Sequence, residues 1–208
     1  MVEDFSLHGP DDSGAASAGS RRELRARLRK QRLALTPPER MAAAESVARR
    51  FSDHLGDKGG YIAGYWAMNG ELPLHVLQMR LSAQQRWCLP MLREDGRLGF
   101  GPWRPGDPLV SNRYDIPEPD LQPDSMLAPE DMAVVLLPLL GYTRAGQRLG
   151  MGGGYYDRSF GFRKRHPAPP LLVGVGYSGQ EIGDISAGDW DVPLDAITTE
   201  REWIDCGR

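Results

Sequence analysis

Hydrophobic and polar positions in the first quarter of the chain repeat with the period of a helix. From residue 20 to 35 the leucines fall on roughly one helical face and arginines fill most of the rest, the leucines being Leu24, Leu28 and Leu35. Thr36 and Pro37 then open a second amphipathic segment, which Gly56 follows. Thr36 with a glutamate three residues later forms a capping box, and proline suits the first helical position. The pattern predicts a basic helix over 20–35 and an amphipathic helix over 36–55.

Beyond residue 60 the pattern changes to short apolar runs separated by turns. Strands are predicted at 61–67, 86–92, 97–103, 132–142, 171–177 and 195–200, and helices at 72–85 and 155–165. The run at 132–142 is nearly continuous, as in a central strand covered on both faces. Prolines recur too densely from 104 to 131 for regular structure, which predicts a long surface loop. The alternation predicts one α/β domain of three layers, a largely parallel open sheet flanked by helices.

Composition narrows the possible partners and compartments. The chain has 208 residues, 40% hydrophobic and 25% charged, which suits one well-cored soluble domain, and we expect a monomer. A net charge of -3 gives no general reason to expect nucleic acid or a membrane as partner. The acidic start predicts a disordered leader over 1–19 ahead of a domain at 20–208. Cys88 and Cys206 match no metal spacing, which favours a reduced, cytoplasmic protein.

Five glycines and one aspartate surround a tyrosine pair between residues 146 and 160. This stretch lies between the strand at 132–142 and the helix at 155–165, where ligands bind in open α/β sheets. Glycines and helix starts together suit phosphate, with a tight structural turn as the alternative. A P-loop is excluded because the stretch has no lysine, and Tyr155 stands where a dinucleotide fingerprint needs its third glycine. Arg148 and Asp157 strengthen the phosphate interpretation, since arginine pairs with phosphate and aspartate beside phosphate typically holds magnesium.

The residues "LLPLLGYTRAGQRLGMGGGYYDRSF", 136–160, closely resemble the signature of the 5-formyltetrahydrofolate cyclo-ligase family. Four further blocks agree with that family in order and spacing: "RRELRARLRKQRLAL", "YWAMNGELPL", "DIPEP" and "DWDVPLDAITTE". The resemblance extends from about residue 20 to 203. It implies an enzyme that uses ATP and Mg²⁺ to convert 5-formyltetrahydrofolate into 5,10-methenyltetrahydrofolate, releasing ADP and phosphate.

The resemblance also implies roles for individual residues. ATP would contact Arg21, Arg25, Arg148, Gly150, Gly152, Gly153, Gly154, Tyr155 and Tyr156. The folate would contact Trp66, Glu71, Met151 and Tyr155. Magnesium would be held by Asp157 and Asp191, and Arg148 would be catalytic. Without the family match, the two helix arginines and Glu71 are better interpreted as solvated polar residues, and Trp66 as part of the core.

Three positions depart from the family pattern. Gly153 stands where some members have lysine, Arg21 replaces the lysine of the first helix, and Trp190 precedes Asp191 where many members have histidine. None of these changes removes a carboxylate or Arg148, so activity is still expected.

Two other function classes stay open. A non-catalytic nucleotide- or folate-binding regulator of the same fold would be expected to lose Arg148 or an aspartate of the metal pair. An RNA-binding protein could use the basic helix at 20–35, but the chain lacks an aromatic-rich RNA module.

Overall fold

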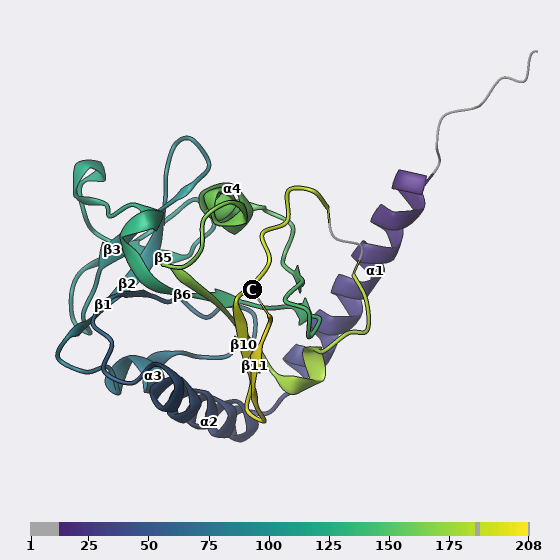
Figure 1. Ribbon diagram of the computed structural model, residues 1–208, viewed down its shortest axis with the longest axis horizontal. Helices are drawn as coiled ribbons and strands as arrows, with labels where there is room; N and C mark the ends of the chain where they lie inside the picture. The colour runs from purple at the N-terminus through teal and green to yellow at the C-terminus, as the bar shows by residue number, and fades with distance from the viewer. Residues whose placement is uncertain (1–12, 186–187, 208) are drawn as a thin grey trace, which may run out of the picture.

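The computed structural model describes residues 13–185 and 188–207, and within them the chain builds a seven-stranded sheet of order β11-β10-β9-β6-β1-β2-β3 (Figure 1). The strands are β1 Gly60–Ala63, β2 Gln85–Leu92, β3 Leu98–Pro102, β6 Met132–Pro138, β9 Leu171–Val175, β10 Ala196–Thr198 and β11 Trp203–Asp205. The five inner strands are parallel to one another, and the edge strands β3 and β11 pair antiparallel with β2 and β10. The predicted largely parallel sheet is confirmed, and the apolar run at 132–142 supplies its central strand, β6.

Helices cover both faces of the sheet, which confirms the three layers. The helices α2 Pro37–Leu55 and α3 His75–Met79 lie on one face, and α4 Tyr155–Phe160 lies on the other (Figure 1). Because side chains alternate along a strand, Val134 and Leu136 of β6 pack in the core beneath α2, and Val135 and Leu137 pack in the core beneath α4. Both sides of β6 are therefore buried, as its unbroken apolar sequence requires.

The basic helix α1, Ser13–Leu33, lies beside the sheet and extends away from it at its N-terminal end (Figure 1). Leu28, 2% exposed, attaches it to a small apolar cluster with Leu140, Leu149 and Ile185. The helix begins at Ser13, before the predicted residue 20, so it includes residues 13–19 of the predicted leader. The remainder of the predicted leader, 1–12, lies outside the described residues.

The ends of several elements follow from local chemistry. Glu39 accepts hydrogen bonds of 2.7 Å from the Thr36 backbone N–H and hydroxyl, and Gly56 with φ +55° ends α2, as predicted. The strand predicted at 61–67 ends earlier, at Ala63. The helix predicted at 72–85 is reduced to α3, because Gln85 already belongs to β2 and pairs with Gly60.

The segment 104–131 contains regular structure, contrary to the prediction. Its strands β4 Leu109–Ser111 and β5 Pro117–Pro119 form an antiparallel hairpin, and short 3₁₀ turns follow at Pro123–Ser125 and Pro129–Asp131. Proline lacks the N–H that an inner strand must donate, but a two-stranded ribbon leaves one side of each strand unpaired. A second short hairpin, β7 Gly141–Tyr142 with β8 Arg148–Leu149, was also not predicted.

Candidate functional site

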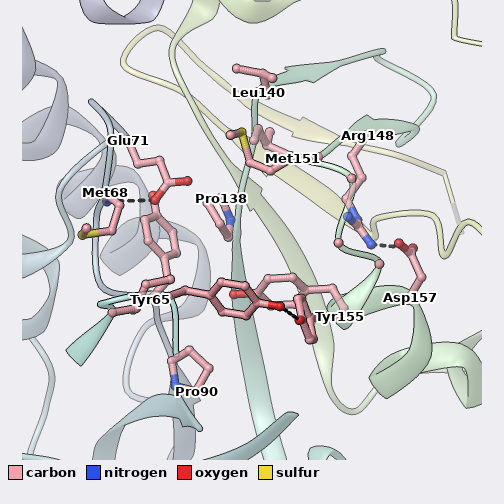
Figure 2. A pocket seen from close by; sticks show the side chains of 18 of the residues that line it. Tyr65, Met68, Glu71, Pro90, Pro138, Leu140, Arg148, Met151, Tyr155 and Asp157 are labelled. Atoms are coloured by element: carbon pink, nitrogen blue, oxygen red, sulfur yellow. Dashed lines mark hydrogen bonds and ion pairs between the residues drawn. The ribbon is translucent and has the colours of Figure 1, made fainter. Parts of the chain in front are cut away.

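A cleft of about 570 Å³ opens at the carboxyl ends of β1 and β6. These two strands are neighbours, but the chain leaves them in opposite directions, from β1 through α3 to β2 and from β6 through α4 to β9. Such a switch point is where open α/β sheets bind their ligands. Figure 2 shows side chains from both loops converging on this space, with Pro138 at the end of β6 between them (Figure 2).

The glycine-rich loop 150–154 forms one wall of the cleft, between β8 and α4. Gly152 and Gly154 have φ values of +101° and +65°, which side chains rarely tolerate. Arg25 of α1 donates from Nε to the Gly150 carbonyl oxygen at 3.0 Å. Because α4 has only six residues, its dipole is weak, and attraction for an anion must come mainly from the nearby arginines.

Arg148 and Asp157 form an ion pair beside this loop. Arg148 Nη2 lies 2.5 Å from Asp157 Oδ1, and the two side chains are 9% and 15% exposed. Asp157 Oδ1 also accepts a hydrogen bond of 3.0 Å from the Val192 backbone N–H. The Arg148 guanidinium lies 5.9 Å from the centre of the Tyr156 ring. Arg148 is thus held in one orientation at the edge of the cleft (Figure 2).

Asp191 joins Asp157 on the cleft wall, although it lies far along the chain. Its Oδ2 accepts a hydrogen bond of 2.8 Å from the Gly188 N–H and lies 3.8 Å from Arg21 Nη2. The described part of the chain has no group of three or more His, Cys, Asp or Glu residues that could hold a metal. Two carboxylates nevertheless fit Mg²⁺, which proteins often bind through one or two carboxylates together with substrate phosphates and water.

Glu71 lies across the cleft from Arg148 (Figure 2). Its Oε2 accepts a hydrogen bond of 3.0 Å from the Met68 N–H, and its Oε1 lies 3.8 Å from Nη1 of Arg32. Burial raises the pKa of Glu71, and the Met68 hydrogen bond and the Arg32 charge oppose that rise. The carboxylate is therefore anchored on one oxygen, with its other oxygen toward the cleft.

Aromatic and apolar side chains complete the lining. Trp66 meets Trp103 edge to face with ring centres 5.9 Å apart, and Met151 is 46% exposed at the cleft. The β4–β5 hairpin reaches the glycine loop from the other side, where the Tyr114 and Tyr155 hydroxyls share a hydrogen bond. The pKa of Tyr155 is lowered mainly by the hydrogen bond from Tyr114 and next by the hydrogen bond from Arg113.

Every site residue predicted from the sequence lines this one cleft: Arg21, Arg25, Trp66, Glu71, Arg148, Gly150, Met151, Gly152, Gly153, Gly154, Tyr155, Tyr156, Asp157 and Asp191. Sequence reasoning missed Arg32, Tyr114 and Glu118, which line it too. One feature of the sequence could have identified Arg32. It lies four residues after Leu28, so both side chains are on the packed face of α1. Glu118 lies in the block "DIPEP", which matched the family pattern but was given no role, and nothing in the sequence marked Tyr114, because the prediction gave their hairpin no structure.

Comparisons with known proteins show the family of the chain and relatives with the same fold. Residues 17–200 match the sequence model of the 5-formyltetrahydrofolate cyclo-ligase family. A 5-formyltetrahydrofolate cyclo-ligase of Escherichia coli (strain K12) is 32% identical over 85% of this chain and 100% of its own length. The same enzyme of Haemophilus influenzae is 30% identical over 84% of this chain and 94% of its own. The NMR structure of Aquifex aeolicus 5,10-methenyltetrahydrofolate synthetase superposes with a TM-score of 0.75 at 28% identity, over 90% of this chain and 93% of that one.

Proposed function

The chain belongs to the 5-formyltetrahydrofolate cyclo-ligase family, and from this premise we propose that it uses ATP and Mg²⁺ to form 5,10-methenyltetrahydrofolate from 5-formyltetrahydrofolate. Its family and relatives make it an enzyme of the cyclo-ligase type. The ATP dependence, the metal and the residue roles are the proposal.

One observation carries this proposal: two chemically different walls meet in one cleft. The wall after β6 presents glycines, Arg148 and Asp157, which suit a triphosphate with its metal. The wall after β1 presents Glu71 and Trp66, which suit a flat ring with N–H donors. A reaction that joins a nucleotide to a folate needs both walls within reach of each other.

On the nucleotide side, Arg148 would neutralise the transferring phosphoryl group and is the proposed catalytic residue. From α1, Arg25 contacts the glycine loop at Gly150 and Arg21 lies near Asp191, and both would bind the remaining phosphates. Gly150, Gly152, Gly153 and Gly154, with Tyr155 and Tyr156, would allow the phosphates to lie against the backbone. Asp157 and Asp191 would hold Mg²⁺, which when bound neutralises phosphate oxygens.

On the folate side, Glu71 would accept hydrogen bonds from the amino and ring N–H groups of the pterin. Trp66 and Met151 would pack against the rings, and Tyr155 would contact both substrates. The Tyr114–Tyr155 contact joins the β4–β5 hairpin to the glycine loop, and a hairpin held there would cover the reacting ends and limit access of water.

The proposed chemistry requires alignment and charge neutralisation more than a protein nucleophile. The formyl oxygen attacks the γ-phosphorus of ATP, and ADP leaves. N10 of the folate then attacks the activated formyl carbon, loses its proton, and phosphate departs with the former formyl oxygen. Arg148 would stabilise the charge that develops on the phosphoryl oxygens in the first step.

We place this reaction in the cytoplasm, carried out by a monomer on small-molecule substrates without nucleic acid or membrane partners. Both cysteines, Cys88 and Cys206, are free thiols, which supports a reducing compartment. In the described residues, no helix combines the length and apolar character that crossing a membrane requires.

A direct assay tests the proposal. Purified protein is mixed with 5-formyltetrahydrofolate, ATP and Mg²⁺, and methenyl absorbance and ADP are followed together. We expect equal amounts of both products, and neither product when ATP or Mg²⁺ is omitted. Methenyl formation without ATP, or ATP hydrolysis without folate turnover, would contradict the mechanism.

A further inference from the structure

Arg32 is a buried cation that the roles proposed above leave unused. It lies in the last turn of α1 and is only 2% exposed. Long charged side chains are almost never fully buried unless they are paired. Its contacts should therefore explain why a charge is kept at this position.

Those contacts join three separate parts of the chain. Arg32 donates from Nε to the Asn69 carbonyl oxygen at 3.2 Å and from Nη1 to the Leu139 carbonyl oxygen at 3.3 Å. The same Nη1 lies 3.8 Å from Glu71 Oε1. Asn69 and Glu71 follow β1, and Leu139 follows β6. Arg32 thus connects α1 to both loops that diverge around the cleft.

Among the contacts of Arg32, Glu71 is the residue with a proposed role in binding the folate. One of its oxygens, Oε2, accepts the Met68 N–H, whereas Oε1 accepts no hydrogen bond from any residue that the structure describes. In Figure 2 this second oxygen is directed toward the middle of the cleft. A carboxylate oxygen in that position can accept ligand N–H groups, provided that the side chain is fixed and ionised.

We propose that Arg32 is a positioning residue for Glu71, whose carboxylate it fixes so that Oε1 accepts hydrogen bonds from the pterin N–H groups of the folate. The inference rests on the function proposed above and adds a residue to it. Arg32 lines the cleft, but its side chain is only 1% exposed and its Nη1 lies 3.8 Å from Glu71 Oε1, so its effect on the substrate passes through Glu71.

The electrostatics of the site agree with this role. Burial raises the pKa of Glu71, and the cation that opposes the rise is Arg32. The other titratable groups that interact with Glu71 are three tyrosines: Tyr65 after β1, Tyr156 in α4 and Tyr177 after β9. Burial raises the pKa of each tyrosine, so they remain neutral near pH 7. A further cation, Arg40 of α2, lies close to the residue that precedes Glu71. A Cβ added to Gly70 would be 3.2 Å from the Arg40 guanidinium.

Removing the Arg32 charge should therefore raise the pKa of Glu71 further. A carboxyl group with a raised pKa is ionised only at higher pH and takes up a proton as the pH falls. The protonated group offers a weaker acceptor, so folate binding should be retained at high pH and lost from the acid side.

Arg32→Met tests this directly, because it keeps the length of the side chain and removes the charge. The dissociation constant for 5-formyltetrahydrofolate is measured by calorimetry without ATP, from about pH 5.5 to 8.5. We expect binding about 10-fold weaker at neutral pH, the usual loss for a hydrogen bond to a charged group. The difference should widen toward acid pH, while KM for ATP changes less than about twofold.

Two further variants separate this role from simple stabilisation. Arg163 is an equally buried arginine, 3% exposed and 2.8 Å from Asp195, but it does not line the cleft. Arg163→Met should lower Tm yet leave folate affinity and its pH profile as in the wild type. Arg32→Lys keeps the charge, so it should keep the wild-type pH profile even where Tm falls.

The outcomes are decisive in each direction. The inference is overturned if Arg32→Met binds folate with wild-type affinity and pH profile, or if Arg163→Met shows the same shift. If Arg32→Met does not fold, Arg32→Lys decides, and an acid-side loss moved toward neutral pH in that variant overturns the inference. Wild-type protein that neither binds nor converts 5-formyltetrahydrofolate refutes the proposed function instead.

Discussion

Replacing Arg148 by alanine removes the cation that pairs with Asp157 at the cleft. The two side chains are 9% and 15% exposed, and their atoms approach to 2.5 Å. Deleting one partner of a buried pair costs about 3–5 kcal/mol, because the other charge is left without compensation. Asp157 keeps some solvent contact and its hydrogen bond from Val192. We therefore expect the free energy of unfolding to fall by less, about 2–3 kcal/mol.

This loss translates into a measurable change in melting temperature. For a chain of this size, each 1 kcal/mol corresponds to about 2–4 °C, so Tm should fall by about 4–12 °C. The effect on turnover should be much larger. Arginines that stabilise a transferring phosphoryl group contribute about 10³-fold or more to kcat. Lysine at this position keeps the charge without the planar fork, so Arg148→Lys should recover only part of the rate.

Calorimetry and the methenyl assay check both effects, with two controls. The double variant Arg148→Ala/Asp157→Asn removes both charges and should recover part of the lost Tm. Arg144→Ala breaks two surface ion pairs, with Glu181 and Glu202, in which the arginine is 53% exposed, and should leave Tm unchanged within error. A kcat of Arg148→Ala within about tenfold of the wild type would refute the catalytic role. A double variant as unstable as Arg148→Ala would refute the explanation by an uncompensated charge.

Three further substitutions probe the remaining parts of the site. Asp157→Asn should raise the Mg²⁺ concentration needed for half-maximal activity, and an unchanged metal titration argues against a metal ligand at this position. Glu71→Gln should raise KM for the folate by about tenfold and leave KM for ATP nearly unchanged; a defect confined to ATP reverses the assignment of the two walls. Gly152→Ala should lower the free energy of unfolding by about 1–3 kcal/mol through backbone strain alone, because φ is +101° and the nearest atom to an added Cβ is 3.9 Å away. Gly179→Ala is its control, since an added Cβ there meets nothing within 4 Å and φ lies outside the left-handed range; equal Tm losses in the two variants would exclude strain as the cause.

Much of the fold could be predicted because its sheet is buried on both faces. The unbroken apolar run of β6 indicated a central parallel strand, and the capping box at Thr36 fixed the start of α2. The gathering of the predicted site residues in one cleft follows from the topology, since loops after neighbouring strands meet at one edge. The family signature named those residues, but only the pairing of β1 with β6 brings Glu71 near the glycine loop.

The remainder depended on contacts that local patterns do not encode. The β4–β5 hairpin is built from prolines that read as irregular structure, and Tyr114 reaches the site only because that hairpin folds back to Tyr155. Arg32 looked like one more exposed arginine in a basic helix. Its burial is set by Asn69, Glu71 and Leu139, which are distant in sequence.

The parallel pairing of β1 with β6 also determines the stage of synthesis at which both walls of the cleft are present. Ile62 lies beside Val134, so the strands that carry the two walls are made well apart in time during synthesis. The ribosome releases Arg32 and Glu71 long before Arg148, and a nascent chain halted in between has no complete place for either substrate. Ligands that need both walls can stabilise only the finished protein, by an amount that grows with the logarithm of their concentration. If both substrates protect a chain against proteolysis, β1 and β6 have therefore already paired in it.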